Sequence, residues 1–336
     1  MKPPVEDKTA QIPKAELHVH LEGSVGIHTL NRLRRRHGKP PIHESPYVFN
    51  RFDAFNRVFL FLSSLLREEA DFHQMAMDFA ARQAADRILY TEASFMPLFH
   101  ISRGIAEEAL FRGIESGLAE GERRHGVTIR LIVSIPRIAG PEAGEKTLAL
   151  IEKHRTPRMV GIDLAGTETE NDVAPFAPTF HKAGHMGLHR VAHAGEFGGS
   201  GQVQQAVDLL GVERVGHGIN AIRDTDLVLR LADTHVALEV CPTSNVQLKA
   251  VASLETHPVR RLFDMGVPIV INTDDPAFFD TTLTRELSLL RGHLGFTEND
   301  VETLIANGFQ YSFLNPEQKP MIMDKRAGKD PGSKAP

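Results

Sequence analysis

The chain has 336 residues, of which 41% are hydrophobic and 24% are charged, close to the average for globular proteins. No apolar stretch approaches the ~20 residues that a membrane-spanning helix requires. The formal net charge of −5 is the opposite of the basic excess typical of nucleic-acid-binding surfaces. We therefore expect a globular protein that acts on a small molecule, with neither a nucleic acid nor a membrane as partner.

The cysteine content and the N-terminal residues bear on the cellular compartment. Cys241 is the only cysteine, so an internal disulfide framework is excluded. Residues 1–12 lack the apolar core of a secretory signal, and we interpret them as an N-terminal extension. These features favour a cytoplasmic location.

Runs typical of β-strands alternate with segments of helical periodicity along most of the chain. Strict alternation predicts a parallel sheet covered by helices, and eight strands close a (β/α)8 TIM barrel. We expect the α/β class, with a single barrel domain over residues 13–323. The predicted strands are residues 15–21, 88–95, 129–135, 160–164, 189–193, 214–218, 236–241 and 268–273.

Four segments depart from this alternation. Residues 25–68 form a long, aromatic-rich insertion after the first strand, and we predict a helical lid over the barrel mouth. Residues 284–294 and 299–313 predict extra C-terminal helices. The polar, Gly- and Pro-containing residues 324–336 predict a disordered tail.

Histidines and carboxylates gather at the predicted C-terminal ends of the strands, where TIM barrels place their catalytic groups. His18 and His20 are two residues apart on one strand, so both point to the same side and can share one cation. His193, His217 and Asp274 end three further strands. Burying these groups together is costly unless a cation neutralises them, so we predict a metal site at the mouth.

Imidazole nitrogens with one carboxylate suit a single zinc ion, with another divalent transition metal as the alternative. A second metal in this type of barrel usually requires a carboxylated lysine at the end of strand four. That strand ends in GIDLAG and the next lysine is Lys182, which favours one metal per subunit.

Six motifs carry a resemblance to a known family. PKAELHVHLEGS, GIDLAG, HAGE, GHGI, CPTSN and NTDDP occur in this order between residue 13 and about residue 313. An isolated HxH pair is weak evidence, whereas the ordered set is specific. The chain resembles the adenosine deaminase family of the amidohydrolase superfamily.

The resemblance implies a role for each matching residue. Glu196 resembles the acid that protonates purine N1, and His217 resembles the residue that orients the attacking hydroxide and takes up its proton. Asp275 is expected to hydrogen-bond N7, and the backbone of Gly166 is expected to meet N3. The implied metal ligands, which leave one position for a water of lowered pKa, are His18, His20, His193 and Asp274.

Several roles have alternatives. Glu196 could instead steer a histidine, and His217 could be a spare metal ligand. Asp163 is as consistent with capping the following loop as with a place in the site. Ser244 is expected to satisfy backbone groups.

The residue type at position 22, a glutamate, leaves the identity of the substrate undecided. Relatives that act on adenosine commonly have aspartate there, and that carboxylate meets the ribose 5′-hydroxyl, whereas HLEG is frequent in adenine deaminases. The remaining motifs favour adenosine or a 5′-modified adenosine, with zinc-dependent deamination to inosine and ammonia as the expected reaction. The alternatives are adenine deamination, aminodeoxyfutalosine deamination, a different amidohydrolase reaction and a non-catalytic purine-binding protein.

Overall fold

The computed structural model describes residues 8–49, 52–168, 173–315 and 317–326. Eight parallel strands follow one another around the sheet in chain order, as the sequence predicts. The strands are β1 (Lys14–His20), β2 (Ile88–Phe95), β3 (Thr128–Pro136), β4 (Met159–Ala165), β5 (His189–Ala194), β6 (Arg214–His217), β7 (Ala237–Val240) and β8 (Ile269–Ile271).

The end of β8 returns to β1 and brings the first and last strands together. Val19 forms a parallel bridge with Asp274. His20 N donates to Asp274 O at 2.8 Å, and Asp274 N donates to His18 O at 3.1 Å. The predicted TIM barrel is therefore confirmed, and its closure places the HxH motif against the aspartate that follows β8.

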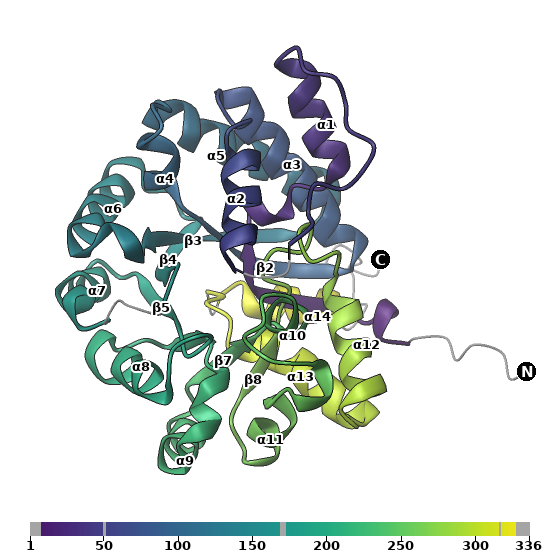
Figure 1. The fold of residues 1–336 in the computed structure, drawn as a ribbon, viewed down its shortest axis with the longest axis vertical. Coiled ribbons are helices and arrows are strands. Elements are labelled where there is room, and N and C mark those ends of the chain that lie inside the picture. The colour runs from purple at the N-terminus through teal and green to yellow at the C-terminus, as the bar shows by residue number, and fades with distance from the viewer. Residues whose placement is uncertain (1–7, 50–51, 169–172, 316, 327–336) are drawn as a thin grey trace, which may run out of the picture.

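Helices surround the strands (Figure 1), and several predicted helices are found close to their expected positions. Glycine ends two of them: Gly126 at the end of α5 and Gly211 after residues 206–210 have left-handed backbone, which glycine adopts without strain. The helices between strands are α3 (Glu69–Ala85), α4 (Pro97–Ile101), α5 (Glu107–His125), α6 (Pro141–His154), α7 (Ala177–His185), α8 (Ser200–Gln205), α9 (Thr225–Thr234), α10 (Pro242–Gln247) and α11 (Val259–Asp264).

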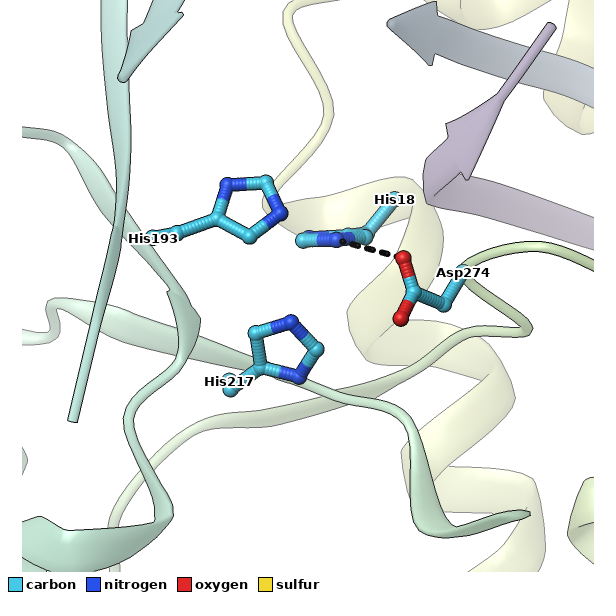
Figure 2. Close-up of side chains that lie close together, drawn as sticks. All are labelled: His18, His193, His217 and Asp274. Atoms are coloured by element: carbon cyan, nitrogen blue, oxygen red, sulfur yellow. Dashed lines mark ion pairs between the residues drawn. The ribbon is translucent and has the colours of Figure 1, made fainter. Parts of the chain in front are cut away.

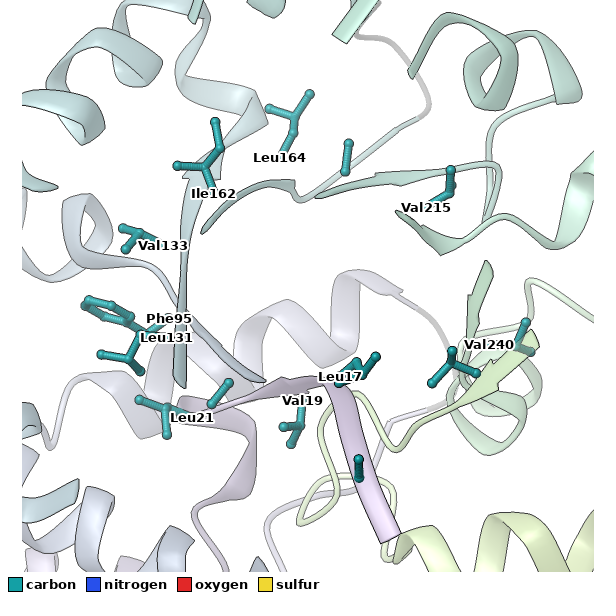
Figure 3. Packing of buried hydrophobic residues seen from close by; sticks show 14 of the residues in the cluster. Leu17, Val19, Leu21, Phe95, Leu131, Val133, Ile162, Leu164, Val215 and Val240 are labelled. Atoms are coloured by element: carbon teal, nitrogen blue, oxygen red, sulfur yellow. The ribbon is translucent and has the colours of Figure 1, made fainter. Parts of the chain in front are cut away.

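The hydrophobic core is built around strands that are covered on both faces. Leu17, Val19 and Leu21 belong to it together with apolar residues of the other strands (Figure 3). Full burial of such a side chain contributes roughly 1.5–3 kcal/mol. These contacts hold β1 in place, so that the intervening His18 and His20 are presented at the mouth.

The insertion after β1 contains α1 (Ile27–Arg36) and α2 (Phe52–Ser63). The ring of Phe55 stacks on Phe279 with 5.8 Å between centroids and meets Phe278 edge-on at 5.5 Å. Because both partners follow β8, the insertion packs beside the C-terminal ends of the strands. Covering of the mouth by this segment stays a prediction.

The C-terminal region adds α12 (Leu283–His293), α13 (Glu298–Gln310) and α14 (Lys319–Arg326). Residues 324–326 are helical where the sequence predicted a disordered tail. The side chain of Ile322 in the same helix is buried, and the guanidinium of Arg326 lies 5.1 Å from the ring centre of Phe309, contacts that composition does not reveal. The rest of the predicted tail lies outside the described residues.

The expected N-terminal extension includes a short 3-10 helix, η1 (Lys8–Gln11), and residues 1–7 lie outside the described part of the chain. None of the helices that the structure describes has the length and apolar character needed to cross a membrane.

Candidate active site

Three imidazoles and one carboxylate converge at the C-terminal ends of the strands (Figure 2). His18 comes from β1, His193 from β5 and His217 from β6, and Asp274 follows β8. One nitrogen or oxygen atom of each lies within 4.8 Å of the others, and all four residues are buried. This spacing is suited to ligands that surround one ion.

His20, the remaining predicted ligand, lies next to this group. Its Nε2 is 3.1 Å from Asp274 Oδ1, and His20, Asp274 and Asp275 form a second cluster of metal-ligand type. Asp274 belongs to both clusters. The structure thus brings all four predicted ligands together, with His217 beside them.

The donor set fits a zinc ion by two criteria. Imidazole and carboxylate are ligands that zinc accepts. In addition, His18 Nε2 is buried and makes no hydrogen bond to the described residues, although it lies 3.5 Å from Asp274 Oδ1 (Figure 2). A buried nitrogen in this state is costly unless a further group binds it, and a metal ion meets that requirement.

Two carboxylates orient the histidine rings from behind. Asp163 Oδ1 lies 3.0 Å from His193 Nδ1, and Glu239 Oε2 lies 2.9 Å from His18 Nδ1. Each carboxylate accepts the Nδ1 hydrogen, which leaves Nε2 as the free lone pair for a metal. Asp163, whose role the sequence left open, therefore contacts the site directly.

Glu239 belongs to a buried chain of charges. Its Oε1 accepts from Arg214 Nε at 2.5 Å, and Arg214 also donates to Glu92 at 2.5 Å. Burial alone would raise the pKa of Glu239, but Arg214 and His18 outweigh it and hold this pKa below its ordinary value. The carboxylate behind His18 is therefore kept ionised.

The side chain of Asp274 accepts a hydrogen bond, and its backbone has an unusual conformation. Ser244 Oγ donates to Asp274 Oδ2 at 2.6 Å, so this serine serves a site residue where the sequence predicted a backbone role. Asp274 and His217 have φ values of 63° and 59°, in the left-handed region that costs non-glycine residues roughly 1–2 kcal/mol. Such strain concentrates at functional sites, where the surrounding structure enforces it.

Glu196 and His217 lie side by side and share Asn245 as a partner. Glu196 Oε2 is 3.7 Å from His217 Nε2, and Asn245 Nδ2 is 2.9 Å from Glu196 Oε1 and 3.1 Å from His217 Nδ1. Burial, reinforced by Asp274 and Glu168, raises the pKa of Glu196 well above its ordinary value, and burial lowers the pKa of His217. The pair is thus suited to hold a protonated carboxyl beside a neutral imidazole.

Glu168 fixes the turn that carries Glu196. Its carboxylate accepts hydrogen bonds from the backbone N–H groups of Gly195, Glu196 and Gly198 at 2.7, 3.0 and 3.0 Å. A buried carboxylate with three such donors is rigidly held. It therefore sets the position of the Glu196 side chain.

Glu22 is buried and turned toward the end of β2. Its Oε1 accepts from His100 Nε2 at 3.0 Å and from the backbone N–H of Met96 at 3.2 Å. Burial opposes ionisation, but the bonds from His100 and the backbone prevail and lower the pKa of Glu22. Glu22 is thus an anion whose Oε1 already accepts two hydrogen bonds from protein groups.

Asp275 and Gly166 complete the predicted substrate contacts. Asp275 Oδ1 is buried without a hydrogen-bond partner among the described residues, and burial, with Asp274 beside it, raises the Asp275 pKa. Gly23 allows this close packing, because a Cβ on it would lie 1.7 Å from Asp275 Oδ1. Gly166 has a φ of 109°, which side chains disfavour, and its backbone lies beside Arg137.

Sequence reasoning missed several residues of the site: His100, Glu168, Glu239 and Asn245. A lone glutamate in the apolar strand Ala237–Val240 was a usable signal for Glu239, since buried charges are rare without a partner. The other three lie in loops or short helices, where the sequence gives no comparable periodicity.

Comparison with known proteins identifies the family of this chain. The adenosine deaminase family model matches residues 13–328. The adenine deaminase of Paraburkholderia phytofirmans is 36% identical over 332 residues, which cover 96% of this chain and 94% of that protein.

Two solved structures are similar over nearly their whole length. The crystal structure of adenine deaminase from Arthrobacter aurescens is 32% identical, with a TM-score of 0.88, and the match covers 94% of this chain and 98% of that one. An amidohydrolase from Burkholderia ambifaria, crystallised with bound zinc, is 26% identical with a TM-score of 0.84, over 97% and 96% of the two chains.

The barrel and the histidine–carboxylate cluster at its mouth define a hydrolase of the amidohydrolase superfamily. Within it, this chain belongs to the adenosine deaminase family, and it is a hydrolytic deaminase. The predicted resemblance is confirmed. For the substrate, the comparisons favour the adenine alternative over the nucleoside interpretation.

Proposed function

We propose that the protein is a zinc-dependent adenine deaminase, which converts adenine and water to hypoxanthine and ammonia. The relatives named adenine deaminase support this substrate. The observation that carries the proposal is the state of Glu22, at the position where the resemblance implies a contact with the ribose 5′-hydroxyl.

Glu22 is poorly placed to recognise a ribose. Its Oε1 is occupied by His100 and by Met96 N, and the side chain is 2% exposed. A ribose hydroxyl that approached Oε1 would compete with the bonds from the buried His100 and from Met96 N. A free base carries no group at that position and leaves the Glu22–His100 pair intact.

The other site residues fit the demands of the ring. Protonated Glu196 would donate to N1, and a protonated Asp275 would donate to N7. The backbone of Gly166 would meet N3, and His217 would orient the attacking water. These groups would hydrogen-bond the edges of the purine ring, and none of them requires a sugar.

The residues that would hold the zinc ion are His18, His20, His193 and Asp274. Glu239 lies behind the His18 ring and Asp163 lies behind the His193 ring. When bound, the ion lowers the pKa of a water molecule so that it becomes a nucleophile near neutral pH. His217, next to these residues, would remain free to contact that water because Asn245 occupies its other nitrogen.

The proposal is tested by measuring kcat/KM of the zinc-loaded protein with adenine, adenosine, deoxyadenosine and methylthioadenosine, following loss of the aminopurine absorbance. We expect adenine to have the highest kcat/KM. A higher value for any nucleoside would reject adenine as the substrate and restore the nucleoside interpretation.

A further inference from the structure

Asn245 and His257 form a buried pair behind the proposed acid and its neighbouring histidine. Asn245 lies on α10, directly after β7, and His257 lies between the 3-10 helix η7 (Leu254–Thr256) and α11. Their exposed fractions are 0% and 3%. His257 has no role in the proposed chemistry so far, and Asn245 enters it only through its contacts with Glu196 and His217.

A line of four hydrogen bonds runs from a backbone amide to both proposed catalytic groups. Val259 N lies 3.1 Å from His257 Nδ1, and His257 Nε2 lies 3.2 Å from Asn245 Oδ1. The amide nitrogen of Asn245 then contacts Glu196 Oε1 and His217 Nδ1 at 2.9 and 3.1 Å. Every polar atom of the Asn245 and His257 side chains thus takes part in a hydrogen bond.

The direction of the whole line follows from its first member. A backbone N–H can only donate, so His257 Nδ1 must accept, and a neutral His257 then carries its hydrogen on Nε2. That hydrogen needs an acceptor, which fixes the carbonyl oxygen of Asn245 toward His257. The opposite amide orientation would require a hydrogen on His257 Nδ1, pointing at the N–H of Val259.

The fixed amide turns both of its hydrogens toward the site. Glu196 Oε1 accepts one of them, so a protonated Glu196 carries its hydrogen on Oε2, which lies 3.7 Å from His217 Nε2. His217 Nδ1 accepts the other, so the neutral ring carries its hydrogen on Nε2. Among uncharged side chains, an amide is suited to this double donation because one nitrogen supplies both hydrogens.

We propose that His257 is a positioning residue that acts through Asn245 to fix the hydrogen on Glu196 Oε2 and on His217 Nε2. The inference deepens the proposed function and rests on it for the role of Glu196 as acid. It also changes the role expected of His217. The sequence resemblance implies that His217 takes up a proton, whereas here its Nε2–H donates a hydrogen bond to the attacking water.

Burial lowers the pKa of His257 to about 4, so the ring stays neutral at assay pH with the single N–H that this geometry requires. Its two ring nitrogens contact Asn245 and the Val259 amide, which are both uncharged.

Two substitutions separate the donor function of His257 from its acceptor function. His257→Gln places an amide nitrogen near the Nε2 position and keeps the donor to Asn245. His257→Asn places an oxygen near the Nδ1 position, keeps the acceptor for Val259 N and loses the donor. We expect kcat to fall about 10- to 100-fold in His257→Asn, a part of the roughly 10²- to 10⁴-fold that a positioned acid supplies.

His257→Gln is expected to recover most of that loss, while KM, zinc content and melting temperature remain similar in the two variants. Equal kcat values in the two variants, whether both high or both low, would overturn the proposal, because a purely structural histidine does not distinguish them.

A second measurement is independent of turnover. Long-range ¹H–¹⁵N spectra of the zinc-loaded protein with labelled histidine report which ring nitrogen carries the hydrogen. We expect the Nε2–H form for His257 and His217 in wild type, and loss of the single form at His217 in His257→Asn. An Nδ1–H ring at either position in wild type would overturn the proposal even if adenine proved not to be the substrate.

Discussion

Glu22 and Glu196 are buried carboxyl groups of the same site whose pKa values are displaced in opposite directions. Burial raises the Glu196 pKa, and Asp274 and Glu168 add to the effect. At Glu22 burial is outweighed by His100 and by backbone donors, so this pKa is lowered. Environments that separate two carboxyl groups in this way assign one to acid chemistry and the other to a fixed anion.

Glu196→Gln tests the acid. Glutamine still accepts from Asn245 through its oxygen but has no proton of suitable acidity to give to N1, so we expect kcat to fall by roughly 10²- to 10⁴-fold. Zinc content, measured by elemental analysis, should match wild type because Glu196 is not a predicted ligand. Unchanged turnover would remove Glu196 as the acid.

Glu22→Asp tests whether Glu22 determines the preference for adenine over adenosine. Aspartate is one methylene shorter, so it gives up the reach to His100 Nε2 and opens space at that end of the site. We expect the ratio of kcat/KM for adenosine to that for adenine to rise. His100→Gln is the matched control, since it retains a donor to Glu22 and should leave the ratio close to wild type. An unchanged ratio in Glu22→Asp would show that Glu22 does not exclude the ribose.

At the scale of the elements, strands β1, β4, β5 and β7 supply either a ligand or the carboxylate that holds one. β1 and β5 present His18 and His193, and β4 and β7 present the carboxylates Asp163 and Glu239 that fix them. Ring orientation therefore depends on other strands as well as on the strand that carries each ligand.

Asp163→Ala tests this division. Without the carboxylate, His193 loses the partner that fixes its ring and its hydrogen, and we expect zinc affinity to fall roughly 10- to 100-fold. Competition with a chromogenic chelator measures it. Asp163→Asn retains an acceptor oxygen and should lose less affinity, whereas wild-type affinity in the alanine variant would contradict the assignment.

The sequence predicted the elements well because βα alternation and strand-end polarity are local patterns. It did not predict the pairs that complete the site. Glu239 meets His18 across 221 residues, and His100 meets Glu22 across 78, and no local pattern encodes such contacts. His257 was hidden for the same reason, because its role depends on an amide that β7 and α10 bring beside it.

On the scale of the whole molecule, a buried histidine makes stability depend on pH. The pKa of His257 is about 4 in the folded protein and 6.5 in the unfolded chain, so the unfolded state binds more protons between these values. Its contribution is complete above pH 6.5 and is lost as pH falls toward 4. The linkage relation gives a loss of about 2 kcal/mol at pH 5.

Urea unfolding of the zinc-free protein at pH 7.5 and pH 5.0 measures this loss, with zinc omitted so that ligand protonation does not release metal during the experiment. In His257→Gln, which has no titrating group at this position, the difference between the two pH values should be smaller than in wild type by about 2 kcal/mol. Equal differences in the two proteins would mean that His257 is not buried in its neutral form.

The most direct test of the central claim is competition between adenine and adenosine at equal concentrations in one reaction of the zinc-loaded protein, with products separated by chromatography. The account predicts that hypoxanthine and ammonia appear in equal amounts while inosine does not accumulate, and that Glu196→Gln forms neither product at a comparable rate. Inosine formed ahead of hypoxanthine would contradict it.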